Sequence, residues 1–238
     1  MARSEHPTFG MIVPPAAGDV PPEPLELFPD LHFVAAGLAL RELSPNGFNQ
    51  VIDDVAACAR SLADQGAEFI SLMGTSLSFY RGPECNAQLV QVMHDATGLP
   101  TTTMTNAVLE ALKQVGGPRI AVATAYTDAL NKPLIRYLET SGFSVESLES
   151  LNISRVEDVF KVTDEELLDL CQKTALASPQ ADVIFLSCGG LQTAALTAPL
   201  EEVTGLPVVS SAMAGTWGTV RLAGLDTRVA GYGRLFEM

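Results

Sequence analysis

The sequence predicts an α/β protein in which parallel strands, buried on both faces, alternate with helices. Three observations support this fold class: short runs that are apolar throughout, amphipathic segments between them, and an internal repeat. Strands covered by helices on both sides lose the alternation of apolar and polar residues, because neither face meets water. The length of 238 residues suits one large domain or two small lobes.

Candidate strands are short apolar runs separated by helical patterns, as expected for parallel strands joined by crossover helices. The runs at 33–35 and 101–103 are weaker than the others. In chain order the candidates are Phe9–Val13, Phe33–Ala35, Phe69–Met73, Thr101–Thr103, Arg119–Ala123, Val183–Ser187 and Val208–Ser210.

Two of the amphipathic segments carry clear helix-start signals. Ser44 and Pro45 place an N-cap residue before a proline at the first helical position. A capping box runs from Thr163 to Glu166. The expected apolar faces are Val51, Val55, Cys58 and Leu62 in the first helix, and Leu167, Leu170, Cys171 and Leu176 in the second.

The chain repeats itself. The tetrapeptide TGLP at 97–100 recurs at 204–207, and FISLMGTSL at 69–77 aligns with VIFLSCGGL at 183–191. The order of expected elements also agrees in the two halves. We therefore expect two similar lobes, one formed by residues 1–115 with 208–238 and the other by 116–207. A cleft between the carboxyl ends of their strands is where open α/β sheets bind ligands.

The charge balance excludes two classes of partner. The chain has 14 Lys and Arg against 28 Asp and Glu, so its formal net charge is −14. Nucleic acids and anionic membrane surfaces need clustered cations, and neither is expected to bind. A small anionic ligand is still compatible, because backbone N–H groups can hold it.

Cysteine and histidine usage points away from disulfides and metals. Four cysteines and three histidines are scattered, and no CxxC pair occurs. The first residues lack the pattern of a signal peptide, and no apolar run is long enough to span a bilayer. The expectation is a cytoplasmic protein without metal or cofactor. The oligomeric state is open, with a monomer expected.

Two turns at equivalent positions of the repeat could carry chemistry. Gly74–Ser76 follows one strand and Cys188–Gly190 follows its counterpart. Such turns expose backbone N–H groups that can bind an oxyanion or carboxylate. The segment 124–127 could add the phenol of Tyr126 to the same cleft. Each turn taken alone is also compatible with an ordinary strand-to-helix connection.

Cys188 is the cysteine with a candidate chemical role. The other three fall on expected helix faces and are interpreted as structural. No His, Lys or Arg is near Cys188 in sequence, and a free thiol has a pKa of roughly 8.5. A protonated thiol is better suited to donating a proton to a carbanion than to acting as a nucleophile.

Several longer stretches carry a family resemblance. They are GMIVPPAAG at 10–18, SLMGTSLSFYRG at 71–82, ATGLP at 96–100, ATAY at 123–126, LSCGGL at 186–191, GLPVVSS at 205–211 and GRLF at 233–236. In these the chain resembles the arylmalonate decarboxylases, a cofactor-free branch of the aspartate/glutamate racemase superfamily. The resemblance implies two pseudo-symmetric lobes, each with a four-stranded parallel sheet flanked by helices, and an active site between them.

The resemblance also implies a reaction. Racemases of the superfamily carry a cysteine in each lobe, whereas this chain has Gly74 at the first position and Cys188 at the second. Racemisation needs an acid/base group on both faces of the substrate carbon, and glycine supplies none. Loss of CO2 from a 2-aryl or 2-alkenyl malonate would generate the carbanion without a base. Cys188 would then protonate one face, giving one enantiomer of the monocarboxylic acid.

The resemblance assigns the remaining site residues. Thr75, Ser76, Tyr126 and Gly189, with the backbone of Cys188, would form a dioxyanion hole for one carboxylate. The aryl and apolar pockets would be lined by Pro14, Pro15, Leu40, Leu43, Phe48, Gly74, Leu77, Ala125, Val156, Val159 and Gly190. Leu43, Phe48 and Val159 depart from the family pattern while keeping the pocket apolar, which puts substrate range in doubt.

Two other functions fit the sequence less well. A racemase or maleate-type cis–trans isomerase of the same superfamily would need the second cysteine that Gly74 replaces. A protein that binds a dicarboxylate without turnover would need the same turns but no proton donor.

Overall fold

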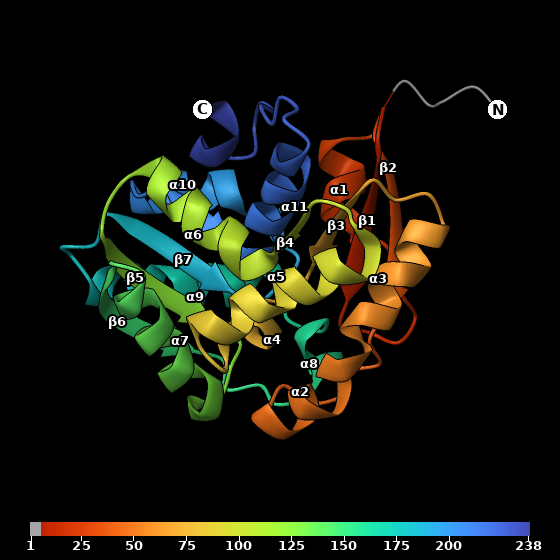
Figure 1. Ribbon diagram of the computed structural model, residues 1–238. Helices are drawn as coiled ribbons and strands as arrows, with labels where there is room; N and C mark the ends of the chain where they lie inside the picture. The colour runs from red at the N-terminus through yellow and green to blue at the C-terminus, as the bar shows by residue number, and fades with distance from the viewer. Residues whose placement is uncertain (1–5) are drawn as a thin grey trace.

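The computed structural model describes residues 6–238 and contains two four-stranded parallel sheets. The strand orders are β2-β1-β3-β4 and β6-β5-β7-β8, so the second sheet repeats the first with each strand number raised by four. Figure 1 shows β1, β2 and β3 on the right and β5, β6 and β7 on the left. The predicted α/β class and the two similar sheets are confirmed.

The first half of the chain supplies the first sheet and its helices. The elements are β1 (Thr8–Val13), α1 (Pro22–Leu27), β2 (His32–Gly37), α2 (Pro45–Val51), the 3-10 turn η1 (Ile52–Asp54), α3 (Val55–Asp64), β3 (Phe69–Leu72), α4 (Thr75–Phe79), α5 (Pro83–Thr97), β4 (Thr101–Thr103) and α6 (Met104–Val115).

The second half repeats the pattern and adds a closing segment. Its elements are β5 (Arg119–Thr124), α7 (Asp128–Thr140), β6 (Ser144–Ser150), α8 (Val156–Val159), α9 (Asp164–Ala177), β7 (Val183–Ser187), α10 (Thr197–Thr204), β8 (Val208–Ser210), α11 (Ser211–Leu222) and the 3-10 turn η2 (Arg234–Glu237).

The repeated TGLP tetrapeptide builds the same turn twice. Gly98 ends α5 and Gly205 ends α10, both with φ of 72°. Their N–H groups donate to the carbonyls of His94 and Glu201 four residues earlier. Glycine takes this left-handed conformation without a Cβ penalty, and the following proline stops the helix. The chain then enters β4 or β8, so the sequence repeat is also a structural repeat.

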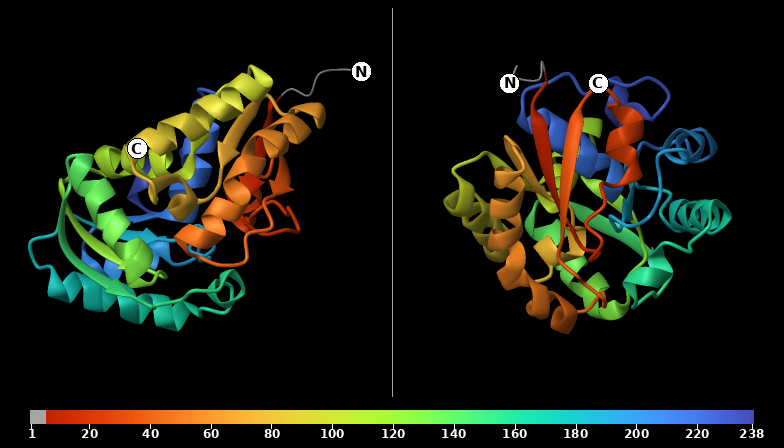
Figure 2. Two further views of the ribbon diagram at one scale, coloured as in Figure 1. Left: turned by 60° about the horizontal axis from the view of Figure 1, so that its bottom comes forward. Right: turned by 90° about the vertical axis from the view of Figure 1, so that its right-hand side faces the viewer.

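The helices cover both sheets. α3 packs on β1 and β2, and α9 packs on β5, β6 and β7. Figure 2 shows α9 lying along the outside of the second sheet. β7 is buried along its whole length, as its continuous apolar sequence predicts. Among the described residues, no helix is both long and apolar enough to cross a membrane.

Three local expectations differ from the structure. Strand β6 was not predicted, because its sequence SVESLES is largely polar and, within residues 6–238, it lies at the edge of the sheet and pairs with β5 alone. The helix expected from Pro45 onward is interrupted at η1, the 3-10 turn Ile52–Asp54. Leu176 is 82% exposed, since nine residues after Leu167 is about two and a half helical turns.

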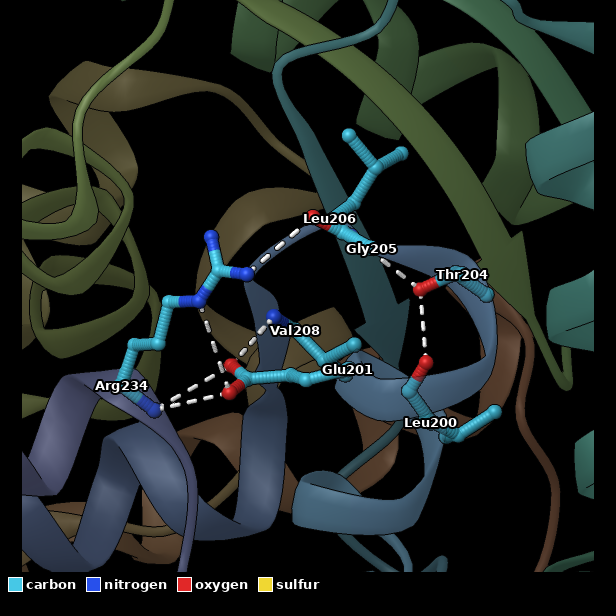
Figure 3. Close-up of polar contacts among 7 residues, drawn as sticks. All are labelled: Leu200, Glu201, Thr204, Gly205, Leu206, Val208 and Arg234. Carbon is cyan, nitrogen blue, oxygen red and sulfur yellow. Dashed lines mark hydrogen bonds and ion pairs between the residues drawn. The ribbon is translucent and has the colours of Figure 1, made fainter.

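Glu201 of α10 ties the C-terminal segment to the second sheet. Its carboxylate accepts from the N–H of Val208 at 2.8 Å and from the N–H of Arg234 at 3.0 Å, and the Arg234 side chain donates to the Gly205 carbonyl at 3.1 Å (Figure 3).

The lobe boundaries, 1–115 with 208–238 and 116–207, stay a prediction. β8 pairs with β7, while α11 packs against α6, β3 and β4.

Candidate active site

A cavity of about 340 Å³ lies where segments from the two sheets meet. Residues that follow β1, β3 and β7 line it, together with the first residue of α6. Because these strands are parallel, their carboxyl ends place the connecting turns at one edge of each sheet. Gly74 and Cys188, from corresponding turns of the two sheets, both line the cavity.

The first turn is held by hydroxyl groups behind the cavity. Gly74 is the N-cap of α4. The Ser78 hydroxyl lies 2.9 Å from the Gly74 carbonyl and 3.0 Å from the Thr75 carbonyl, and Thr105 donates to the same Thr75 carbonyl at 3.0 Å. These bonds fix the backbone of the turn. The first N–H groups of α4 have no partner within the helix and can bind an anion.

The second turn is fixed by residues that the sequence reasoning did not single out. The N–H of Cys188 donates to the Ser211 hydroxyl at 3.3 Å. Gly189 lies against Met104, whose Sδ would be only 2.7 Å from an added Cβ. A side chain at position 189 would therefore require Met104 to move. The contacting atoms are the flexible end of the Met104 side chain, which can shift.

Cys188 is buried, with 6% of its residue surface exposed. Burial raises its pKa to about 11, and nearby N–H groups of Gly190 and Leu191 and the hydroxyl of Tyr126 offset the effect only in part. Desolvation disfavours the charged thiolate, so the neutral thiol dominates at neutral pH. The group is therefore suited to donating a proton rather than to attacking as a nucleophile.

Tyr126 lies beneath the cavity rather than on its surface. It is fully buried, its ring packs edge-on against Phe79, and the Ser187 hydroxyl donates to its phenol oxygen at 3.4 Å. Burial raises the pKa of Tyr126 well above its ordinary value, despite nearby hydroxyls of Ser187, Ser76 and Thr75. The phenol stays protonated and can donate a hydrogen bond toward the two turns.

One end of the cavity is apolar and is built by a contact between the two halves of the chain. Glu42 and Arg155 form an antiparallel bridge, and the N–H of Leu43 donates to the Ser154 carbonyl at 2.8 Å. This pairing brings the segment around Leu40 to the segment around Val156. Its apolar side chains are Leu40, Leu43, Leu77, Val156 and Val159.

Most of the expected site residues share this cavity. Those that line it are Pro14, Pro15, Leu40, Leu43, Gly74, Thr75, Ser76, Leu77, Val156, Val159, Cys188, Gly189 and Gly190. Tyr126, Ala125 and Phe48 are fully buried and are not part of its lining. Phe48 packs instead against Tyr80, with ring centroids 4.8 Å apart.

Several lining residues were not singled out from the sequence. They include Met73, Met104, Asp19, Glu23, Phe160 and Gln192. Glu23 follows two prolines in a segment with no motif, so no local signal marks it. Met104 follows a predicted strand, but its place in the site follows from its contacts with Gly189 and with the Thr75 hydroxyl, which donates to its Sδ at 2.9 Å.

The other cysteines lie outside the cavity. Cys171 is buried in α9, where burial raises its pKa to about 12. Cys58 and Cys85 are partly buried, and all four cysteines are free thiols. Among the described residues, no group of three or more His, Cys, Asp or Glu side chains could hold a metal ion.

Comparison with known proteins assigns the family. A model of the arylmalonate decarboxylase family matches residues 9–236. The chain belongs to this family. It is 48% identical to arylmalonate decarboxylase of Bordetella bronchiseptica over 238 residues, which covers 100% of this chain and 99% of that protein.

Solved structures agree with the family assignment. The liganded Gly74Cys-Cys188Ser mutant of arylmalonate decarboxylase superposes with a TM-score of 0.95 at 48% identity, covering 97% of this chain and 99% of that one. A maleate isomerase of Pseudomonas putida is 28% identical over 76% of this chain and 74% of its own length. The maleate isomerase Iso from Pseudomonas putida S16, 21% identical with a TM-score of 0.88 over 98% of both chains, shares the fold.

Proposed function

We propose that this enzyme decarboxylates 2-aryl or 2-alkenyl malonates to one enantiomer of the 2-substituted monocarboxylic acid, without metal or cofactor. The observation that carries the proposal is the pairing of Gly74 with Cys188 across one cavity. One side offers a buried, protonated thiol and the other offers no acid or base. The family assignment supports the same reaction type.

One carboxylate of the malonate binds between the two turns. The hydroxyls of Thr75 and Ser76, the phenol of Tyr126 and the N–H of Gly189 form the dioxyanion hole. These donors would stabilise the charge that collects as the enediolate forms. The Thr75 hydroxyl donates to Sδ of Met104 at 2.9 Å, so it has to turn toward the carboxylate when the malonate binds. A buried phenol is well suited, because its raised pKa keeps the hydroxyl proton in place.

The other carboxylate lies at the apolar end, among Leu40, Leu43 and Val156. An ionised carboxylate is poorly solvated there, which raises its free energy, whereas neutral CO2 has no charge to solvate. The apolar end therefore favours the loss of CO2. The bond between the α-carbon and this carboxylate breaks, CO2 leaves, and the electron pair stays in the enediolate. The aryl group, which lies toward Pro14, Pro15 and Gly190, delocalises the charge.

Cys188 completes the reaction. Its S–H proton moves to the α-carbon, the enediolate becomes a carboxylate, and the resulting thiolate regains a proton from water. Because Gly74 on the opposite side cannot donate, one face alone receives the proton. The product is therefore a single enantiomer.

Proton NMR of 2-methyl-2-phenylmalonate with the purified protein in D2O tests the proposal. We expect 2-phenylpropionate with deuterium at the α-carbon and no change after dialysis against a chelator. Failure of a folded sample to release CO2 from any aryl or alkenyl malonate would refute it. Exchange at the α-carbon of an amino acid, or conversion of maleate to fumarate, would instead support a racemase or isomerase.

A further inference from the structure

The cavity has a polar wall that the proposed decarboxylation does not use. Asp19, Glu23 and Gln192 line it together. Glu23 lies in the first turn of α1 and is only 3% exposed, although Asp19 and Gln192 are exposed. Carboxyl groups are rarely buried to this extent unless a partner compensates the lost hydration.

Protein groups compensate Glu23 only in part. Its own N–H and that of Thr193 lie close to the carboxyl group, while burial and the charge of Glu26 raise its pKa. Among the residues that line the cavity there is no Lys or Arg. A carboxylate has about four acceptor positions, and two backbone N–H groups leave capacity for a further donor.

The position of Glu23 places this acceptor on the side of the cavity expected to hold the aryl group. The nearby N–H of Thr193 belongs to the loop that begins with Cys188–Gly190, and the adjacent Gln192 also lines the cavity. The apolar end around Leu40 and Val156 is built by a different contact, the bridge between Glu42 and Arg155.

We propose that the preferred substrates are aryl malonates whose ring carries a hydroxyl or amino group that donates a hydrogen bond to Glu23. This inference rests on the proposed decarboxylation and adds the chemical class of the aryl group. A donor on the substrate adds a further partner for the buried carboxyl group, beside the N–H groups of Glu23 and Thr193. Substrates without a donor would lack this hydrogen bond.

The test compares meta- and para-hydroxyphenylmalonate with the matching methoxyphenylmalonates, which have similar electronic effects but no donor. The measured quantity is the ratio of kcat/KM for hydroxyl over methoxy. We expect a ratio of about ten for the unmodified enzyme, near the value of one charge-assisted hydrogen bond. In Glu23→Leu the ratio should fall to about one, and in Glu23→Gln, which keeps an acceptor oxygen, to an intermediate value.

Glu26→Gln is the matched control. It removes the same charge from the same helix at an exposed position whose carboxylate accepts from Tyr232, and it should keep the ratio. A ratio near one in the unmodified enzyme, or one that is equal in all variants, would overturn the inference.

Calorimetry measures binding without turnover, so it tests the hydrogen bond to Glu23 independently of the decarboxylation. Hydroxyphenylacetate should bind more tightly than methoxyphenylacetate to the unmodified protein, and the preference should vanish in Glu23→Leu. Such a preference without any CO2 release would refute the proposed function and retain the donor subsite. Equal binding of both acids would refute the subsite.

Discussion

Gly74 and Cys188 occupy corresponding turns after β3 and β7, the matching strands of the two sheets, and line the same cavity. The fold therefore places two equivalent positions at one ligand, and the side chains at these positions differ. Since a thiol stands at one and a hydrogen atom at the other, an almost symmetric scaffold contains an asymmetric site. The first four predictions below concern this site.

Replacing the thiol should stop the reaction without unfolding the protein. We expect Cys188→Ser to lower kcat for phenylmalonate by roughly 10²- to 10⁴-fold, because a serine hydroxyl is a much weaker acid. CO2 release and circular dichroism measure the two quantities. Cys85→Ser changes a thiol that does not line the cavity and should keep full activity. A Cys188→Ser enzyme with more than half the original rate would remove Cys188 from the mechanism.

Moving the thiol to the other turn should reverse the product. An added Cβ at Gly74 would meet Leu77 at 3.3 Å and Pro14 at 3.5 Å, so a cysteine fits after a small shift. The double variant Gly74→Cys with Cys188→Ser should protonate the opposite face and yield the other enantiomer. Chiral chromatography of 2-phenylpropionate gives the answer. Retention of the original enantiomer would show that another group delivers the proton.

In the single variant Gly74→Cys, each of the two turns carries a cysteine. With an acid/base group on each face of the substrate carbon, the enzyme should exchange the α-proton of the product acid and racemise the acid. The unmodified enzyme should leave the acid intact. Incubation of one enantiomer of 2-phenylpropionate in D2O, followed by polarimetry and NMR, measures this. No exchange above the unmodified enzyme would indicate that the two turns do not address opposite faces of one carbon.

The pH dependence should follow the buried thiol. Because burial raises the pKa of Cys188 to about 11, the thiol should remain protonated through the alkaline range below that value. The difference in thiolate absorbance between the unmodified protein and Cys188→Ser should have its midpoint near 11. An unfolded thiol ionises earlier, so Cys188 stabilises the fold below its ordinary pKa, and this contribution is lost as the pH rises toward 11. A midpoint at or below the ordinary thiol pKa would contradict the proton-donor role.

The contacts of the Glu201 carboxylate with Val208 and Arg234 should contribute to stability rather than to catalysis. In Glu201→Ala the N–H groups of Val208 and Arg234 lose their acceptor. Val208 is buried, and an unsatisfied buried N–H costs about 1–3 kcal/mol, so the free energy of unfolding should fall by about that amount or slightly more. Urea denaturation measures the change. Glu202→Ala, at an exposed neighbour, should change the stability by no more than about 0.5 kcal/mol.

Much of the fold could be predicted from local patterns. Local sequence runs predicted seven of the eight strands found in residues 6–238, six of them apolar and one, Thr101–Thr103, composed of threonines. The TGLP repeat predicted two similar units. These signals are local, because burial on both faces and a left-handed glycine cap depend on adjacent residues. The polar strand β6 was not predicted, because its sequence has no apolar run and its place in the sheet depends on pairing with β5, on the other side of α7 in the chain.

The sequence by itself determined the chemical asymmetry of the site, because aligning the two halves sets Gly74 opposite Cys188. Only the tertiary structure decided which other residues belong to the cavity. Glu23 reaches it from α1, Met104 packs under Gly189, and Tyr126 lies below the cavity surface. The physical reason is that membership of a cavity depends on packing between distant segments. The same packing removes water from Cys188 and raises its pKa, which no local pattern encodes.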